Sequence, residues 1–439
     1  MKSKIAVLVS MMLALLMASL DTTIMNTTMP LIAKSLGGFD LFAWPFATYM
    51  IATTVLAPVA GRLSDLYGRK QVFASGMIVF LIGSLLCGLS QTMIQLVIFR
   101  GIQGIGAGFM MPFPAIIAGD LFSVEKRGKI QAIGTSMWGL SAVIAPLLGA
   151  FFVEHSTWRW IFFVNIPIAL LALVALLPYR EEYTPKKAQI DYIGTLLFTT
   201  GVTLLLLVTV VDRNPFVYGL AGALFVICFY FFEKRQSSSL IPFSIFRDKT
   251  LRWMNINGFL GWAALFGAAS YIPLFLQNMA HLTIFTSGIV LLGTAIGWIT
   301  ASVPTGTWIL KYGYRPLFII GNALLAFSGV LLALLHEESG FWYVFIVMII
   351  QGLAFGMLST TGVIGAQQLV QAHEKGISTS FMMFSRNIGT AIGVTIMGAF
   401  LSKSEDFMSG MYQLFLYGLM GSLLAFVTSF FIKDRQSVK

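Results

Sequence analysis

The sequence has few charged residues and almost no cysteine. Only 10% of its 439 residues are charged, against roughly a quarter in ordinary soluble domains. The two cysteines, Cys87 and Cys228, fall in apolar runs, which is typical of small buried side chains and excludes a disulfide framework or a zinc pattern. The four histidines are scattered and no Walker loop occurs. These absences argue against an enzyme, so no catalytic residue, metal site or cofactor is expected.

Long apolar runs take the place of charge. Hydrophobic residues make up 57% of the chain, more than a soluble fold can bury, and a membrane-spanning helix needs about 20 apolar residues. The first run is too long for a signal peptide and contains an aspartate. We predict fourteen spans; the alternative count is twelve, with 190–232 as one folded-over insertion. The fourteen spans lie near 5–32, 42–62, 71–91, 95–119, 130–153, 159–178, 190–211, 216–232, 252–277, 284–310, 316–335, 341–366, 377–400 and 411–432.

The basic residues orient these spans. With the N-terminus in the cytoplasm, 22 of the 28 Lys and Arg fall on the cytoplasmic side and four in outer loops. This bias is the positive-inside signal, and it places the C-terminus in the cytoplasm too. The net charge of +10 is spread over many short loops, so it does not indicate a nucleic-acid partner.

Two motifs recur in the two halves of the sequence. GRLSDLYGRK at 61–70 is echoed by GTWILKYGYR at 306–315, and QGIGAG at 103–108 by QGLAFG at 351–356. Parallel repeats of this kind are typical of transporters that bind substrate between two halves. We therefore predict an N-terminal six-helix bundle over 1–178 and a C-terminal one over 252–439. Between them, residues 179–251 hold an inserted helix pair at about 190–211 and 216–232.

Several stretches resemble those of the major facilitator superfamily. They are the 61–70 loop, RGIQGIGAG at 100–108 and GLSAVIAPLLGAFF at 139–152. LDTTIMNTTMP at 20–30 and WRWIFFVNIPI at 158–168 resemble motifs of its fourteen-helix drug:proton antiporters. The resemblance covers the whole chain. It implies an all-α membrane protein of the major facilitator fold that works by alternating access.

The resemblance also assigns candidate residues at two places. The 61–70 loop is expected to act as a cytoplasmic gate, in which Asp65 meets a helix N-terminus or a basic partner; the alternative is a loop that only orients the protein. In the second half Leu310 replaces this aspartate, so a one-sided gate is expected. Gly139, Pro146 and Gly149 match the antiporter helix, where they permit bending and close packing. The gate residues are Gly61, Arg62, Asp65, Gly68, Arg69 and Lys70.

Asp21 is the carboxylate that the span map places well inside a helix, where an ionised group is costly and points to function. Arg100 falls at a similar depth in span 4. A carboxyl group that is balanced between burial and a nearby arginine can take up and release a proton. We predict that Asp21 couples transport to protons and that Arg100 tunes it. A permanent structural pair and direct binding of a cationic substrate remain the alternatives.

Arg386 is the other deep charge, and it is followed by Asn387. It is expected either to contact an anionic part of a substrate or gate, or to serve structure. Methionines, aromatics and amides suit adaptable pockets, although such residues are also common in packed or lipid-facing positions. The candidate cavity residues are Met25, Gln103, Trp138, Asn257, Trp262, Tyr271, Arg386 and Asn387.

These observations favour a proton-coupled antiporter that exports small amphipathic compounds across a bacterial cytoplasmic membrane. Its expected partners are protons, the substrate and membrane lipids, and a monomer is expected. The absence of acids from the second-half spans leaves room for neutral, zwitterionic or anionic substrates. The rival within the same fold is a translocase for lipids or lipid-linked molecules. A passive channel is disfavoured because lone charges make no ring within one chain.

Overall fold

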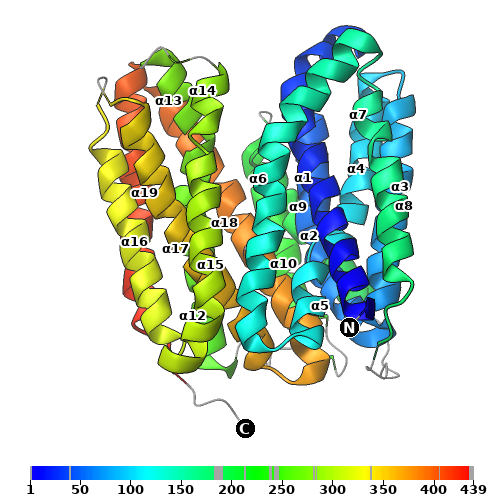
Figure 1. The fold of residues 1–439 in the computed structure, drawn as a ribbon, viewed down its shortest axis with the longest axis vertical. Coiled ribbons are helices and arrows are strands. Elements are labelled where there is room, and N and C mark those ends of the chain that lie inside the picture. The colour runs from blue at the N-terminus through cyan, green and yellow to red at the C-terminus, as the bar shows by residue number, and fades with distance from the viewer. Residues whose placement is uncertain are drawn as a thin grey trace. The chain divides into compact units, whose positions relative to one another are not determined.

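The computed structural model describes residues 2–38, 41–181, 191–211, 214–236, 240–241, 247–279, 282, 284–336, 339–404 and 406–434. Within this part of the chain every regular element is a helix (Figure 1). The chain divides into two compact units. Unit 1 comprises Met1–Leu121, Met137–Phe243 and Ala372–Phe381. Unit 2 comprises Phe122–Ser136, Ser244–Gln371 and Met382–Lys439.

The helices of the first half belong mainly to unit 1, and only the start of α6 belongs to unit 2. Proline stands in the first turn of α2 and α10, where its missing N–H costs nothing. The helices are α1 (Lys2–Leu36), α2 (Trp44–Tyr67), α3 (Arg69–Leu89), α4 (Met93–Met110), α5 (Phe113–Leu121), α6 (Val124–His155), α7 (Trp160–Phe163), α8 (Asn165–Leu176), α9 (Tyr192–Leu207) and α10 (Pro215–Glu233).

The helices of the second half belong mainly to unit 2, and only η4 and the start of α18 belong to unit 1. Here η2 is a short π-helix, while η3 and η4 are 3-10 turns. The elements are α12 (Lys249–Gly261), η2 (Trp262–Phe266), η3 (Gly267–Ser270), α13 (Ile272–Asn278), α14 (Ile284–Ile289), α15 (Leu292–Tyr312), α16 (Arg315–Ala333), α17 (Phe341–Gln368), η4 (Ala372–Glu374), α18 (Lys375–Lys403) and α19 (Phe407–Ser429).

The same helix neighbours recur in the two units. In unit 1, α4 packs against both α2 and α3, and α1 packs against α8. In unit 2, α17 packs against both α15 and α16, and α12 packs against α19. These pairs join helices that the repeated motifs match, since α2 and α15 carry the two Tyr-Gly loops and α4 and α17 the two Gln-Gly motifs. The repeat is therefore visible in the packing as well as in the sequence.

Each of the fourteen predicted spans contains helix, in several cases broken into two or three pieces. Ten of the described helical stretches are long and apolar enough to cross a membrane, and 160–176 and 192–207 are shorter apolar helices. The protein is thus a multi-pass membrane protein. The count of fourteen spans, the cytoplasmic termini and the predicted domain boundaries stay predictions. The inserted pair α9 and α10 pack against each other and belong to unit 1.

Candidate functional site: a buried ion pair and a charged helix turn

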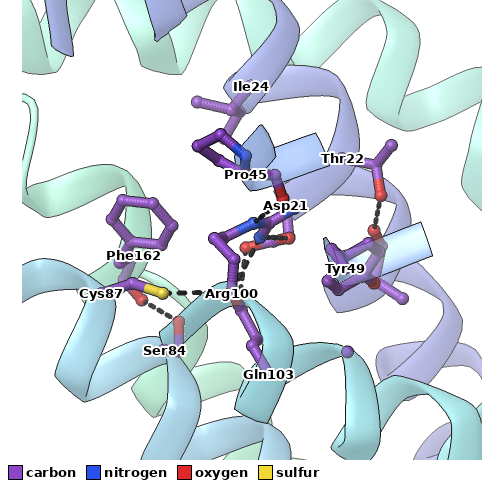
Figure 2. A network of polar contacts seen from close by, with 12 residues as sticks. Asp21, Thr22, Ile24, Pro45, Tyr49, Ser84, Cys87, Arg100, Gln103 and Phe162 are labelled. Atoms are coloured by element: carbon purple, nitrogen blue, oxygen red, sulfur yellow. Dashed lines mark hydrogen bonds and ion pairs between the residues drawn. The ribbon is translucent and has the colours of Figure 1, made fainter. Parts of the chain in front are cut away.

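Asp21 and Arg100 form an ion pair inside unit 1 (Figure 2). Asp21 lies on α1 and Arg100 on α4, and Arg100 Nη1 is 2.6 Å from Asp21 Oδ2. Both side chains are 1% exposed. Charges this far from water need a partner, because an unpaired buried charge is strongly destabilising. The sequence suggested this pairing as a possibility, and the structure shows it.

Two amide side chains complete the contacts of the Asp21 carboxylate. Gln103 Nε2 donates to Asp21 Oδ1 at 2.7 Å, and Gln103 Oε1 accepts from Arg100 Nη1 at 2.7 Å. Asn165, the first residue of α8, donates from Nδ2 to Asp21 Oδ1 at 3.3 Å and to Ser84 Oγ at 2.9 Å. The carboxylate therefore holds α1, α4 and α8 together, and Ser84 extends the network to α3.

Arg100 also has partners other than Asp21. Its Nε donates to the Pro45 carbonyl at 3.4 Å, and its Cζ lies 4.2 Å from the centroid of the Tyr49 ring. A guanidinium over an aromatic face is attracted by the ring quadrupole. With Gln103 as a further acceptor, Arg100 thus has contacts on α2 and α4 in addition to its ion pair with Asp21.

An apolar cluster of unit 1 includes the neighbours of Asp21 on α1. Its buried members include Leu20, Ile24, Met25, Leu96 and Phe162. Such an environment weakens dielectric screening, so the ion pair interacts more strongly than it would at a surface. Met25, a predicted cavity residue, is fully buried in this cluster; a contact with substrate stays a prediction.

Asn165 is a site residue that the sequence analysis missed. It is the one amide in the quoted WRWIFFVNIPI stretch, and an isolated polar residue in an apolar run is the signal that pointed to Asp21. The two residues are 144 positions apart. Nothing local in the sequence shows that they meet.

Glu233 is a buried acid that was not predicted from the sequence, and it lies at the C-terminal end of α10. Glu233, the last residue of α10, is 1% exposed, and its Oε1 accepts from the Ile241 backbone N–H at 2.7 Å. Within the described residues, Glu233 Oε2 and Asp191 Oδ2 have no hydrogen-bond partner. Both oxygens face Gly194 near the start of α9. Glu233 is thus a buried acid at the end of a helix, whereas Asp21 is buried in the middle of α1.

Asp65, the central residue of the predicted gate, caps the N-terminus of α18. Its Oδ1 accepts from the Gly376 N–H at 3.0 Å and its Oδ2 from the Ile377 N–H at 2.8 Å. These N–H groups have no partner inside their own helix, and the helix dipole favours an anion there. Gly61 approaches the same turn, since a Cβ at Gly61 would lie 2.6 Å from the Gly376 carbonyl oxygen. The predicted contact with a helix N-terminus is present.

Arg69 connects Asp65 to further charged residues. It forms a buried ion pair with Asp65 and donates from Nε to Asp120 Oδ2 at 3.1 Å. Lys375 Nζ lies 3.7 Å from Asp120 Oδ1. Two cations and two carboxylates thus alternate at the turn between α2 and α3. Arg62 is half-buried there.

Two carboxylates to which no sequence motif pointed cap repeat-related helices. Glu181, which follows α8, accepts from the backbone N–H groups of Arg69 and Lys70 at the start of α3. Asp434, which follows α19, accepts from those of Tyr314 at 2.6 Å and Arg315 at 2.9 Å, at the start of α16. In each half, an acidic residue that follows the last helix of the repeat thus caps the N-terminus of the helix that comes after the Tyr-Gly loop.

Side chains complete these two caps. Lys70 Nζ donates to the Leu177 carbonyl at 2.7 Å and the Tyr179 carbonyl at 2.9 Å, beyond the end of α8. A cation near a helix C-terminus complements the exposed carbonyls. Beside the second cap, burial raises the pKa of Tyr314 to about 12, so its hydroxyl stays protonated at neutral pH.

Both caps depend on a glycine with positive φ. Gly68 has φ 101° and Gly313 has φ 81°, and a Cβ at Gly68 would lie 2.6 Å from Glu181 Oε2. We expect Gly68→Ala to cost about 1–3 kcal/mol, because only glycine adopts this backbone region readily, and to lower the melting temperature of the purified protein. Gly288→Ala is the control, since Gly288 has ordinary φ and a Cβ there would meet no atom within 4 Å. Equal melting temperatures for the two variants would contradict the cap argument.

The predicted antiporter helix is α6. Gly139 is half-buried and Gly149 is buried, whereas Trp138 is 42% exposed. The side chain of Pro146 lies outside the described part of the structure. Ser141 of the same helix shares a hydrogen bond of 2.5 Å with Ser19 of α1. This contact ties α6 to the helix that carries Asp21, and the antiport role of α6 stays a prediction.

Two second-half candidates have their polar groups engaged in packing. Asn257 donates from Nδ2 to the Ala425 carbonyl at 2.7 Å and to Thr428 Oγ1 at 2.9 Å. Tyr271 Oη donates to the Val394 carbonyl at 2.9 Å. Asn257 thus joins α12 to α19, and Tyr271 contacts α18. Both contacts join helices of unit 2, and a substrate role for either residue stays a prediction.

Three other second-half candidates lie on adjacent helices. Trp262 begins the π-helix η2 and is 6% exposed, as is Arg386 of α18, whose Cζ lies 4.4 Å from the Trp262 ring centroid. Asn387 is half-buried next to Arg386. The structure thus brings Arg386 and Trp262 together, and Asn387 adds a polar group beside them.

Comparison with known proteins identifies the family. Residues 11–309 and 280–439 match the model of the Major Facilitator Superfamily. The chain belongs to the major facilitator superfamily. This family and its fold are those of membrane transporters rather than enzymes.

Curated relatives align over most of the chain. It is 33% identical to multidrug resistance protein 3 of Bacillus subtilis strain 168, over 92% of this chain and 82% of that protein. It is 32% identical to the multidrug transporter protein MdtP of the same strain, over 89% and 74%. It is 30% identical to the multidrug efflux pump SdrM of Staphylococcus aureus strain N315, over 91% and 90%.

Solved structures share the fold at low sequence identity. The proton:xylose symporter XylE, bound to 6-bromo-6-deoxy-D-glucose, gives a TM-score of 0.71 at 15% identity, over 98% of this chain and 96% of that one. The human organic anion transporter MFSD10 gives 0.71 at 16% identity, over 98% and 99%. These similarities establish the major facilitator fold for the chain, and no more than the fold.

Proposed function

We propose that the protein is a proton-coupled antiporter of the bacterial cytoplasmic membrane that exports small amphipathic compounds. Inward movement of protons drives export as the protein alternates between outward-open and inward-open states. Relatives named as multidrug transporters at about 30% identity support the substrate class. The buried pair of Asp21 and Arg100 is the observation that carries the proton coupling.

The geometry suggests how the proton is handled. Both oxygens of Asp21 accept hydrogen bonds, one from Arg100 and the other from Gln103 and Asn165. A proton on Asp21 removes the ion pair and turns one acceptor into a donor, so α1 and α4 lose an attraction that holds them together. Arg100 retains its contacts with Gln103 and the Tyr49 ring. Asp21 is therefore the proposed proton carrier, and Arg100 its positioning partner.

The charged turn between α2 and α3 is the proposed cytoplasmic gate. Asp65 holds the first turn of α18 through two backbone N–H groups, and these bonds must break for α2 and α18 to separate. Leu310, which replaces the aspartate in the second half, is 55% exposed. This supports a gate with a carboxylate on one side of the repeat only.

Transport by proteoliposomes tests the function. The protein is reconstituted into vesicles that contain a pH-sensitive dye, and ethidium or the zwitterionic fluoroquinolone norfloxacin is added under an imposed pH gradient. We expect compound-dependent proton movement, and we expect an ionophore that collapses the gradient to abolish accumulation of the compound. Accumulation that persists after the gradient has collapsed would contradict proton coupling.

The same vesicles distinguish the rival lipid translocase. A fluorescent phospholipid placed in the inner leaflet reports translocation when an impermeant reductant quenches the outer leaflet. We expect no difference from protein-free vesicles. Rapid translocation without compound-dependent proton movement would replace the antiporter proposal by the lipid one.

A further inference from the structure

Within the described residues, Arg386 lacks the carboxylate partner that Arg69 and Arg100 have. Its Nη2 donates to the Leu358 and Ser359 carbonyls and its Nη1 to Ser359 Oγ, each at 3.3 Å. Its Nε has no hydrogen-bond partner among the residues that the structure describes. Arg69 and Arg100, by contrast, each form an ion pair with an aspartate. Within this part of the chain the Arg386 charge is thus balanced by long bonds to neutral oxygens and by the Trp262 ring, and by no carboxylate.

An aromatic cluster lies against Arg386 in unit 2. Trp262 is at its centre, with its ring centroid 4.9 Å from that of Phe355 and 6.3 Å from that of Trp298. Phe266 stacks on Trp262 at 6.2 Å. Trp262 and Phe355 are buried, whereas Trp298 is half-buried and Phe266 is 36% exposed. The cluster therefore has a buried end beside Arg386 and an open end at Phe266 and Trp298.

The backbone of this cluster is irregular. Trp262–Phe266 forms the π-helix η2, which the 3-10 turn η3 follows, and π-helical turns are frequent at functional sites. Gln351 Nε2 donates to the Leu265 carbonyl of this turn at 3.1 Å. Gln351 is the repeat counterpart of Gln103, which contacts Asp21 in unit 1. In unit 2 a backbone carbonyl thus takes the place of the acid, and the local charge is left positive.

We propose that Arg386 and the aromatic cluster of Trp262, Phe266, Trp298 and Phe355 form a subsite for an anionic amphiphile with a flat apolar body. The carboxylate of the ligand pairs with Arg386, using the unbonded Nε–H, while its ring packs against Trp298 and Phe266. A guanidinium is suited to a carboxylate because its N–H groups match the two oxygens. This inference rests on the proposed function and names one substrate class of the exporter.

A cation is the wrong ligand for this subsite. Within the described residues no carboxylate pairs with Arg386, so an ammonium group beside the guanidinium would meet like charge without compensation. A neutral molecule gains the aromatic contacts and can accept a hydrogen bond from Arg386 Nε, but it does not compensate the charge of the guanidinium. The order of affinity should therefore be anion, then neutral molecule, then cation, for ligands of equal shape.

Binding of three isosteric probes to the purified protein in detergent tests this order. The probes are 2-naphthoate, 2-naphthamide and 2-naphthylmethylammonium, measured by isothermal titration calorimetry at neutral pH. We expect 2-naphthoate to bind at least about tenfold more tightly than 2-naphthamide, since hydrogen bonds to charged groups are the stronger ones. Equal binding of the carboxylate and the amide by the wild-type protein would overturn the proposal.

Variants locate the site. We expect Arg386→Gln to remove the preference for 2-naphthoate and Arg386→Lys to keep part of it. Trp298→Ala, at the open end of the cluster, should weaken the carboxylate and the amide alike. Arg252→Gln changes an exposed arginine of α12 and should leave both affinities unchanged. If Arg386→Gln does not fold, Arg386→Lys and Trp298→Ala still decide, and an unchanged affinity in both would refute the site.

Asp21→Asn separates this inference from the proposed function. Asp21 belongs to unit 1 and the cluster residues to unit 2, so this variant should bind 2-naphthoate as the wild type does while it loses proton coupling. Selective binding without any proton movement would support the subsite and contradict the antiporter. Proton-coupled export of ethidium without selective binding of 2-naphthoate would do the reverse.

Discussion

Asp21→Asn should reduce compound-dependent proton movement in proteoliposomes to the level of protein-free vesicles. Asparagine keeps the shape of the side chain and one oxygen acceptor for Arg100, but it cannot carry a proton at neutral pH. It also leaves the Arg100 charge buried without a counter-ion, which costs about 3–5 kcal/mol when one partner of a buried pair is removed. Both effects should appear, one as lost coupling and the other as a lower melting temperature.

The double variant Asp21→Asn/Arg100→Gln separates the two effects. Removing both charges should restore most of the lost stability, because no unpaired charge remains, while proton coupling stays absent. Asp406→Asn is the matched control. Asp406 is an exposed cap of α19, and asparagine caps a helix about as well. Proton movement that survives in Asp21→Asn would show that another group carries the proton.

Asp65→Ala should impair both stability and transport. It removes the acceptor for the Gly376 and Ile377 N–H groups and the buried partner of Arg69. Loss of one side of a buried, hydrogen-bonded charge pair predicts destabilisation by about 3–5 kcal/mol. Because the same bonds hold the first turn of α18, we also expect the closed gate to be less populated, and uptake of compound against the gradient to fall.

Thermal unfolding and transport of the Leu310→Ala variant give the comparison for Asp65→Ala. Leu310 occupies the repeat-related position, but it is 55% exposed and its side chain carries no polar group. We expect this change to alter stability by less than about 0.5 kcal/mol and to leave transport intact. Similar losses of stability and transport in both variants would show that the two turns contribute equally, which would contradict a one-sided gate.

Much of the architecture could be read from the sequence. Apolar run length placed helix in each predicted segment, and two short motifs predicted which helices would have equivalent neighbours in the two halves. The interruptions of the helices within single spans were not predicted. The span near 252–277 contains α12, a π-turn, a 3-10 turn and α13, because bonding partners such as Gln351 come from another helix and leave no local signal.

The candidate site was predicted in part. Asp21 was conspicuous because an acid is rare in an apolar run, and its depth relative to Arg100 suggested the pair. The amide side chains that donate hydrogen bonds to the buried Asp21 carboxylate were harder to predict. Gln103 was not foreseen as a partner of Asp21, and its predicted place in the substrate cavity stays a prediction; Asn165 was overlooked. The contact of Asp65 with a helix N-terminus was predicted. The caps that Glu181 and Asp434 form at the starts of α3 and α16 were not predicted, because these two acids are far from those helices in the sequence.

The sequence by itself determined where apolar helices lie and which helices repeat, since these follow from composition and spacing along one chain. Only the tertiary structure decided which polar groups satisfy each buried charge. Asp21, Arg69 and Arg100 find charged or amide partners on other helices, whereas Arg386 finds an aromatic face and backbone carbonyls. The physical reason is that a buried charge must be compensated at hydrogen-bond distance, and those distances are set by helix packing rather than by position along the chain.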